Sequence, residues 1–99
     1  AEGGFKEFKT REVLKEALIS FGLEPESIKS CAQTGWVVDI QGTGQAQSEN
    51  EGPKMIAIRA DMDALPMPEN NPNLEYRTTT KFAHMCGHDG HMATLLSAA

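Results

Sequence analysis

The sequence predicts an α/β fold in which a helix and two strands precede a loop that leads into a second helix. Three observations predict it. An amphipathic repeat of apolar residues covers 11–21, segment 36–40 is rich in β-branched and aromatic residues while segment 55–60 is nearly all apolar, and a second helical repeat starts at Met92. The chain has 99 residues, of which 39% are hydrophobic, so it is one domain at most with a modest core.

The first helix is expected to begin near Thr10, because threonine is a common N-cap residue. Its apolar positions recur at i, i+3, i+4 and i+7, and charged and polar residues occupy the opposite face. The apolar positions are Leu14, Ala17, Leu18 and Phe21. Gly22 and then Pro25 provide the stop signal. The simplest role for such a helix is packing on a sheet.

Residues 23–30 are expected to connect this helix to a first strand at 36–40, where aromatic and β-branched residues follow a glycine. The polar segment 42–53 is predicted to be a surface loop that leads to an antiparallel second strand. That strand, 55–60, is nearly all apolar, which is typical of a central strand buried on both faces. Prolines and asparagines predict a stiff, irregular loop over 66–76.

Asp61 and Asp63 come directly after this second strand. Carboxylates at the carboxyl end of a buried strand lie where α/β proteins usually place their chemistry. A turn or cap role before Ala64 is an equally good alternative for the aspartates taken alone.

The strongest chemical signal is segment 84–91, which holds all three histidines of the chain and one of its two cysteines. Cys86 and His88 are two residues apart, so on extended backbone a thiolate and an imidazole would project to the same side and could bind one transition-metal ion. Gly87 would ease the backbone there. The start of the following helix would favour the anionic thiolate of Cys86, and Asp89 is expected to cap that helix.

Four interpretations of this segment compete. The first is half of a catalytic metal site, in which Cys86 and His88 supply two ligands and an upstream aspartate adds a ligand or orients an imidazole. The second is a structural zinc site that uses Cys86, His88 and His91, with His84 as a further candidate, although its spacing matches no common zinc module. The third is a nucleophilic site in which Cys86 attacks, but no third orienting residue is evident. The fourth is a histidine-rich helix start with no ligand role, which the tight grouping disfavours.

Segment 58–66 (Ile-Arg-Ala-Asp-Met-Asp-Ala-Leu-Pro) and segment 84–93 (His-Met-Cys-Gly-His-Asp-Gly-His-Met-Ala) resemble the M20 metallopeptidase clan. The nearest match is its amidohydrolase branch, which includes N-acyl-amino-acid amidohydrolases, hippurate hydrolases and auxin-conjugate hydrolases. Segment 4–10 also resembles that branch. The resemblance implies that residues 1–99 are the N-terminal part of a mixed-sheet catalytic domain, with the lid domain and the remaining metal ligands absent.

The resemblance also implies roles for single residues. Cys86 and His88 match the first two metal ligands of a binuclear centre, which usually holds two zinc or manganese ions. Asp63 matches the carboxylate behind a ligand and is the expected catalytic residue. Asp61 stands where many clan members have a metal-binding histidine. No ligand role follows for His84, Asp89 or His91.

The activity implied is metal-assisted hydrolysis of the amide bond of N-acyl amino acids or similar small amides, in which a glutamate acts as general base. That glutamate normally lies in a later Glu-Glu pair, so the chain alone lacks it. The alternative is a non-catalytic fragment or degenerate paralogue that acts as a structural subunit. The expected assembly is a homodimer of the longer parent, or a complex with a partner that covers the open sheet edge.

Charge and composition exclude other classes. The net charge is -5 and no basic run is present, which argues against nucleic acid and anionic membranes as partners. No apolar stretch reaches the roughly 20 residues of a membrane span, and no signal peptide is visible. Two cysteines do not make a disulfide scaffold, so a reducing compartment such as the cytoplasm is expected.

Overall fold

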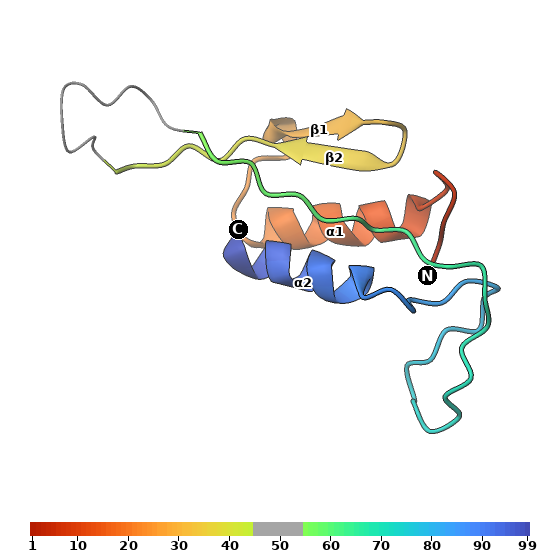
Figure 1. Cartoon of the computed structure of the whole chain (residues 1–99). Helices are drawn as coiled ribbons and strands as arrows, with labels where there is room; N and C mark the ends of the chain where they lie inside the picture. Colours follow the sequence, from red (N-terminus) through yellow and green to blue (C-terminus); the bar gives the residue numbers. More distant parts are fainter. Residues whose placement is uncertain (45–54) are drawn as a thin grey trace.

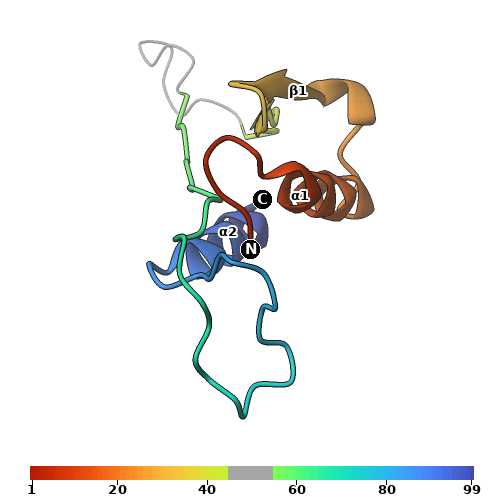
Figure 2. The same cartoon turned by 90° about the vertical axis from the view of Figure 1, so that its right-hand side faces the viewer.

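The structure is a computed structural model that describes residues 1–44 and 55–99. In chain order it contains helix α1 (Phe8–Ser20), the 3-10 turn η1 (Pro25–Ser27), strands β1 (Ile28–Cys31) and β2 (Gly35–Val38), and helix α2 (His88–Ala98). The two strands lie over α1, and α2 runs alongside α1 (Figure 1; Figure 2). The predicted α/β class is confirmed, although one of its two strands is not the expected one. The predicted loop over 42–53 lies mostly outside the described residues.

Helix α1 begins earlier than the sequence predicted. Its first residue is Phe8 and Glu7 occupies the N-cap position, so the expected cap at Thr10 is wrong. Thr10 lies in the first turn instead, where its backbone N–H and its hydroxyl both donate to the Glu2 carboxylate, at 2.7 and 3.0 Å. The carboxylate of a distant residue therefore satisfies a free N–H of the first turn. The predicted stop at Gly22 is confirmed, because its φ of 98° ends the helix and its N–H donates to the Ile19 carbonyl at 3.0 Å.

The same contacts lower the pKa of the Glu2 carboxylate. Burial on its own raises the pKa of Glu2, but hydrogen bonds from the backbone N–H groups of Thr10 and Lys9 and from the Thr10 hydroxyl outweigh it and hold the pKa below its ordinary value. The charged form of Glu2 therefore fastens the N-terminal arm to α1.

Strands β1 and β2 form an antiparallel pair in which Ile28 faces Val38 and Cys31 faces Gly35. The predicted strand at 36–40 is confirmed as β2, although it is shorter. Strand β1 was expected to be part of a connector, and that expectation is wrong. Its sequence has weak strand character, and the pairing depends on a tight turn in which Ala32 and Gln33 take left-handed φ values of 48° and 68°.

Trp36 of β2 joins the sheet to α1. Its indole N–H donates to the Arg11 carbonyl at 2.7 Å. The Arg11 guanidinium carbon lies 3.8 Å from the centroid of the Trp36 ring, and the Lys15 ammonium lies 5.2 Å from it. Arg11 also donates to the carbonyl of Gln33 at 2.6 Å, which fastens the strand turn to the helix. A cation–π stack and two hydrogen bonds thus hold helix and sheet together.

A buried polar pair lies beneath this contact. The side chains of Glu7 and Thr34 are only 4% and 2% exposed, and the Thr34 hydroxyl donates to the Glu7 carboxylate at 2.7 Å. The other carboxylate oxygen of Glu7 accepts from the Phe5 N–H at 3.0 Å. Both oxygens of the buried acid are therefore satisfied, as a buried polar group requires.

The predicted strand at 55–60 is not formed. These residues are extended but pair with no strand among the described residues, and Met55, Ile56 and Ile58 are 90%, 87% and 65% exposed. The physical reason is that a strand buried on both faces needs neighbours on both sides and layers above and below, and the described residues supply none of them here. Residues 55–60 are apolar, as noted from the sequence, but their burial depends on neighbouring strands and layers.

Helix α2 confirms the helical repeat near the C-terminal end, and it starts at His88. Its N-cap residue is Gly87 with a φ of 82°, so the expected cap by Asp89 is wrong: Asp89 lies in the first turn, and no side chain caps the helix. Glycine at the N-cap position has no side chain that could accept a hydrogen bond from the first turn. Neither helix in the described ranges has the length and hydrophobicity needed to cross a membrane.

Candidate metal centre

One short antiparallel bridge brings the two predicted motifs together. Leu65 and Ala83 exchange both backbone hydrogen bonds, each at 3.0 Å. Residues before 65 and after 83 therefore run side by side, which sets Asp61 and Asp63 opposite the histidine-rich segment. Ala83 is fully buried and Ala64 is 7% exposed, so the bridge lies in the small core.

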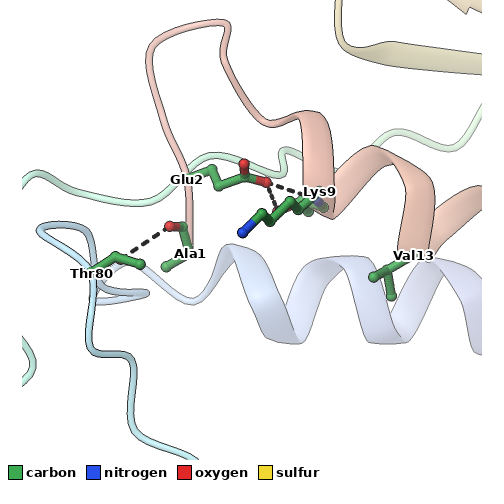
Figure 3. A pocket seen from close by; sticks show the side chains of 6 residues that line it. Ala1, Glu2, Lys9, Val13 and Thr80 are labelled. Atoms are coloured by element: carbon green, nitrogen blue, oxygen red, sulfur yellow. Dashed lines mark hydrogen bonds between the residues drawn. The ribbon is translucent and has the colours of Figure 1, made fainter.

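The N-terminal arm supports the bridge from the other side. The Ala64 N–H donates to the Glu2 carbonyl at 2.7 Å, and the Thr80 hydroxyl donates to the Ala1 carbonyl at 3.2 Å. Gly3 is buried where an added methyl group would lie 2.8 Å from the Ala64 carbonyl oxygen, so only glycine allows this close approach. A hollow of about 360 Å³ lies beside the arm and is lined by Ala1, Glu2, Lys9, Thr10, Val13 and Thr80. Figure 3 shows the side chains that line it. None of these lining residues belongs to the predicted metal site.

His88 is the centre of the candidate site. Its Nδ1 lies 2.8 Å from Oδ1 of Asp63 and 3.1 Å from the Asp63 backbone carbonyl. Both of these oxygens accept hydrogen bonds, so we assign a ring proton to Nδ1. A histidine whose second nitrogen is held by a carboxylate is the usual arrangement of a metal-binding imidazole. The side chain of His88 is 19% exposed, so the ring is fixed but reachable.

Asp61 lies on the other side of the same ring. Its Oδ2 is 3.9 Å from Nε2 of His88, and its Oδ1 accepts from the Arg59 guanidinium at 2.7 Å. The two aspartates of the motif therefore take opposite sides of one imidazole. Asp63 orients the ring, and Asp61 faces its free nitrogen.

Cys86 occupies a bend just before α2 and is exposed as a free thiol. The expectation of extended backbone from Cys86 to His88 is wrong, because Gly87 is left-handed and His88 is already helical. Within residues 1–44 and 55–99, no three side chains of histidine, cysteine, aspartate or glutamate converge into a metal site. The ligand roles of Cys86 and His88 remain predictions, and the observed convergence is that of His88 with the two aspartates.

The remaining histidines lie around this site in different ways. The ring of His91, in the first turn of α2, is 5.8 Å from that of His88, measured between centroids. The Nδ1 of His84 is buried, and none of the described residues forms a hydrogen bond with it.

Imidazole, thiolate and carboxylate are all ligand types that zinc accepts, but among the described residues only His88 and the two aspartates are brought together. Sequence reasoning found His88 and Asp63, but it left the role of Asp61 open and did not consider Arg59. The signals for Asp61 were its place after the predicted strand and the family resemblance, whereas the signal for Arg59 was its place in the same short motif.

Two comparisons with known proteins bear on this site. The model of "Peptidase family M20/M25/M40" matches residues 57–99, which include every residue of the candidate site. No solved structure matches the chain significantly.

Curated relatives align with nearly the whole chain. Thermostable carboxypeptidase 1 of Saccharolobus solfataricus is 37% identical over 99% of this chain, hippurate hydrolase of Campylobacter jejuni is 39% identical over 99%, and N-acetyl-L-cysteine deacetylase of Bacillus subtilis is 42% identical over 95%. The chain spans 23%, 23% and 20% of the lengths of these relatives. Residues 57–99 therefore match the M20 metallopeptidase family, and the resemblance of the chain to its amidohydrolase branch is confirmed.

Proposed function

We propose that this chain is part of a metal-dependent amidohydrolase that cleaves the amide bond of N-acyl amino acids or similar small amides. The observation that carries the proposal is the Asp63–His88 pair at 2.8 Å, which leaves the Nε2 of His88 free and oriented. Two of the aligned relatives are named for hydrolysis of hippurate and for removal of the acetyl group of N-acetyl-L-cysteine, both of which are N-acyl amino acids.

The proposed centre holds two divalent ions, zinc or manganese, with Cys86 and His88 as ligands from this chain. When bound, such ions polarise the acyl carbonyl and lower the pKa of a bound water. Asp63 keeps the His88 proton on Nδ1, so that Nε2 is available as a ligand. A general base must come from elsewhere, since these 99 residues contain no Glu-Glu pair of the kind the resemblance implies.

Assembly and compartment follow the same proposal. The parent enzyme is a homodimer, and an apolar segment as exposed as 55–58 requires cover from further protein. The two cysteines are free thiols, in keeping with the cytoplasm as the proposed compartment.

The experiment uses the intact natural polypeptide that carries this sequence. We expect it to hydrolyse N-acetyl amino acids and hippurate, to lose this activity on treatment with a chelator, and to regain it with Zn²⁺ or Mn²⁺. His88→Ala should abolish tight metal binding while the protein stays folded. A folded wild-type protein without bound metal and without amidase turnover would contradict the proposal and favour a non-catalytic structural subunit.

A further inference from the structure

One peptide group connects the N-terminal arm to His88. The N–H of this group belongs to Ala64 and donates to the Glu2 carbonyl at 2.7 Å. Its C=O belongs to Asp63 and lies 3.1 Å from the protonated Nδ1 of His88. The N–H and the C=O of a trans peptide point in opposite directions within one plane. The arm therefore holds one edge of this plane, and the imidazole contacts the other.

The Asp63 side chain cannot fix the imidazole by itself. Its carboxylate accepts from Nδ1 of His88 at 2.8 Å, but the side chain is 51% exposed, and water competes for exposed pairs of this kind. The backbone carbonyl of Asp63, in contrast, can turn only if the whole peptide plane turns. Because Ala64 is buried, the hydrogen bond that holds this plane to Glu2 is shielded from water. The shielded bond is therefore the one that fixes the orientation of residue 63.

Glu2 is itself fixed at its other end. Its carboxylate accepts from the backbone N–H and the hydroxyl of Thr10 at 2.7 and 3.0 Å (Figure 3). Hydrogen bonds to an ionised acceptor are stronger than those between neutral groups. The first turn of α1 thus holds the side chain of Glu2, while the main chain of Glu2 holds the peptide group beside the candidate site.

Gly3 allows the arm to come this close. A methyl group at this position would lie 2.8 Å from the Ala64 carbonyl oxygen and 3.0 Å from Cε1 of Phe82. Both distances are shorter than side chains tolerate, so a larger residue would push the arm away from Ala64. The φ of Gly3 is not left-handed, so the position requires space and not an unusual backbone conformation.

We propose that Glu2 is a positioning residue for His88, which it holds through the peptide group between Asp63 and Ala64. The side chain of Glu2 contacts α1, its carbonyl holds the peptide plane, and this plane aims the carbonyl and the carboxylate of Asp63 at Nδ1. Hydrogen bonds in series polarise one another, so the bond at Glu2 also strengthens the one at His88. The importance of this arrangement for the reaction rests on the proposed function, in which His88 is a ligand.

The test observes the His88 ring directly. The intact natural polypeptide is stripped of metal and labelled with ¹⁵N-histidine, and His88→Gln assigns the ring signals. The measured quantities are the ¹⁵N shifts of the ring and the rate at which the Nδ1 proton exchanges with water. In Glu2→Ala the arm loses its hold on α1, so this exchange should accelerate about 10-fold, as expected for the loss of one hydrogen bond. In Glu2→Gln the amide oxygen can still accept from Thr10, so the acceleration should be no more than about threefold.

Gly3→Ala tests the same contact from the other side. It leaves the Glu2 carboxylate unchanged but intrudes on Ala64, and it should also accelerate exchange of the His88 proton about 10-fold. The matched control is Gly42→Ala, which adds the same methyl group where no other heavy atom lies within 4 Å. This control should change the exchange rate by less than about twofold.

Positioning is distinguished from general stabilisation by the neighbouring amides. The N–H groups of Leu65 and Ala83 donate to each other's carbonyls and not to the arm. In Glu2→Ala the Ala64 amide should lose protection from exchange, whereas these two bridge amides should keep it. If Glu2→Ala does not fold, the comparison of Gly3→Ala with Gly42→Ala decides.

Two results would overturn the positioning role. The first is wild-type exchange and wild-type ¹⁵N shifts of the His88 ring in both Glu2→Ala and Gly3→Ala. The second is an equal loss of protection at Ala64 and at the bridge amides, because the arm would then only stabilise the region.

The proposed function is judged separately, from metal binding and amidase turnover of the wild type. A wild type that has neither, with altered His88 signals in Glu2→Ala, would overturn the proposed function and support the positioning role. A wild type that has both, with unaltered His88 signals in Glu2→Ala, would overturn the positioning role alone.

Discussion

Two regions of this chain are held together by different kinds of contact. Residues 7–38, which we call the packing unit, hold α1, β1 and β2 together through side chains, with the Trp36 stack and the buried Glu7–Thr34 pair at its centre. Residues 55–65 and 82–91, which we call the motif segments, carry the candidate chemistry and are joined mainly by one backbone bridge. Their apolar stretch is largely exposed.

The difference shows where stability and chemistry lie in this molecule. The packing unit is held together by its own polar and aromatic contacts. The motif segments have correct local geometry around His88, yet their strand residues lack the neighbours that would bury them. Substitutions in the packing unit should therefore change stability, and substitutions in the motif segments should change metal binding.

The largest effect is expected for Trp36→Ala in the packing unit. This change removes the indole hydrogen bond to Arg11 and the ring beneath its guanidinium. Truncation of a packed aromatic side chain costs about 3 kcal/mol in the free energy of unfolding. Hydrogen exchange of the α1 amides in the intact polypeptide measures the loss. Val37→Ala, on the neighbouring half-exposed side chain, is the control, and equal losses in both variants would contradict the central role of Trp36.

The second effect is expected for Thr34→Val. The variant preserves the shape of the side chain but leaves one oxygen of the buried Glu7 carboxylate without a donor. An unsatisfied buried polar group costs about 2 kcal/mol. Thr34→Ser, which retains the hydroxyl, should lose much less. Chemical denaturation compares the two, and a Thr34→Val protein as stable as the Ser variant would show that this hydrogen bond contributes nothing.

Asp63→Asn, in the motif segments, should weaken metal binding without changing the stability of the packing unit. The side chain is 51% exposed, so its loss should leave the packing unit unchanged. The His88 ring would lose its charged acceptor, and loss of such a partner weakens metal affinity by about 10-fold or more. Zn²⁺ titration measures the affinity, and Asp39→Asn is the control for a lost exposed charge. Unchanged affinity in Asp63→Asn would mean that Asp63 does not orient the ligand.

The smallest effect is expected at Glu2, whose carboxylate joins the N-terminal arm to α1. Because its pKa is lowered in the folded protein, its contribution to stability is fully present above the ordinary value of 4.5 and is lost as pH falls through the lowered folded value. The difference in melting temperature between wild type and Glu2→Gln should therefore be greatest near neutral pH and shrink below 4.5. Glu16→Gln, on the exposed face of α1, should show no such trend, and a difference between wild type and Glu2→Gln that grows in acid would contradict the sign.

Local signals in the sequence predicted several elements correctly. The apolar repeat and Gly22 placed α1 and its end, the aromatic and β-branched run placed β2, and the second repeat placed α2. Strand β1 was missed because its residues are weak strand formers that depend on pairing with β2. Thr10 was mistaken for an N-cap because nothing local shows that Glu2 reaches across to the same turn.

The family resemblance, the α/β class and the residue types at the candidate site follow from the sequence alone, because long motifs and hydrophobic periodicity are properties of neighbouring residues. The contacts of Asp61 and Asp63 with different nitrogens of His88 are visible only in the structure, because they join segments that the Leu65–Ala83 bridge brings together. The left-handed turn at Gly87 and the Arg59–Asp61 pair are local, and they depend on the conformation that the backbone and the side chains adopt in the fold.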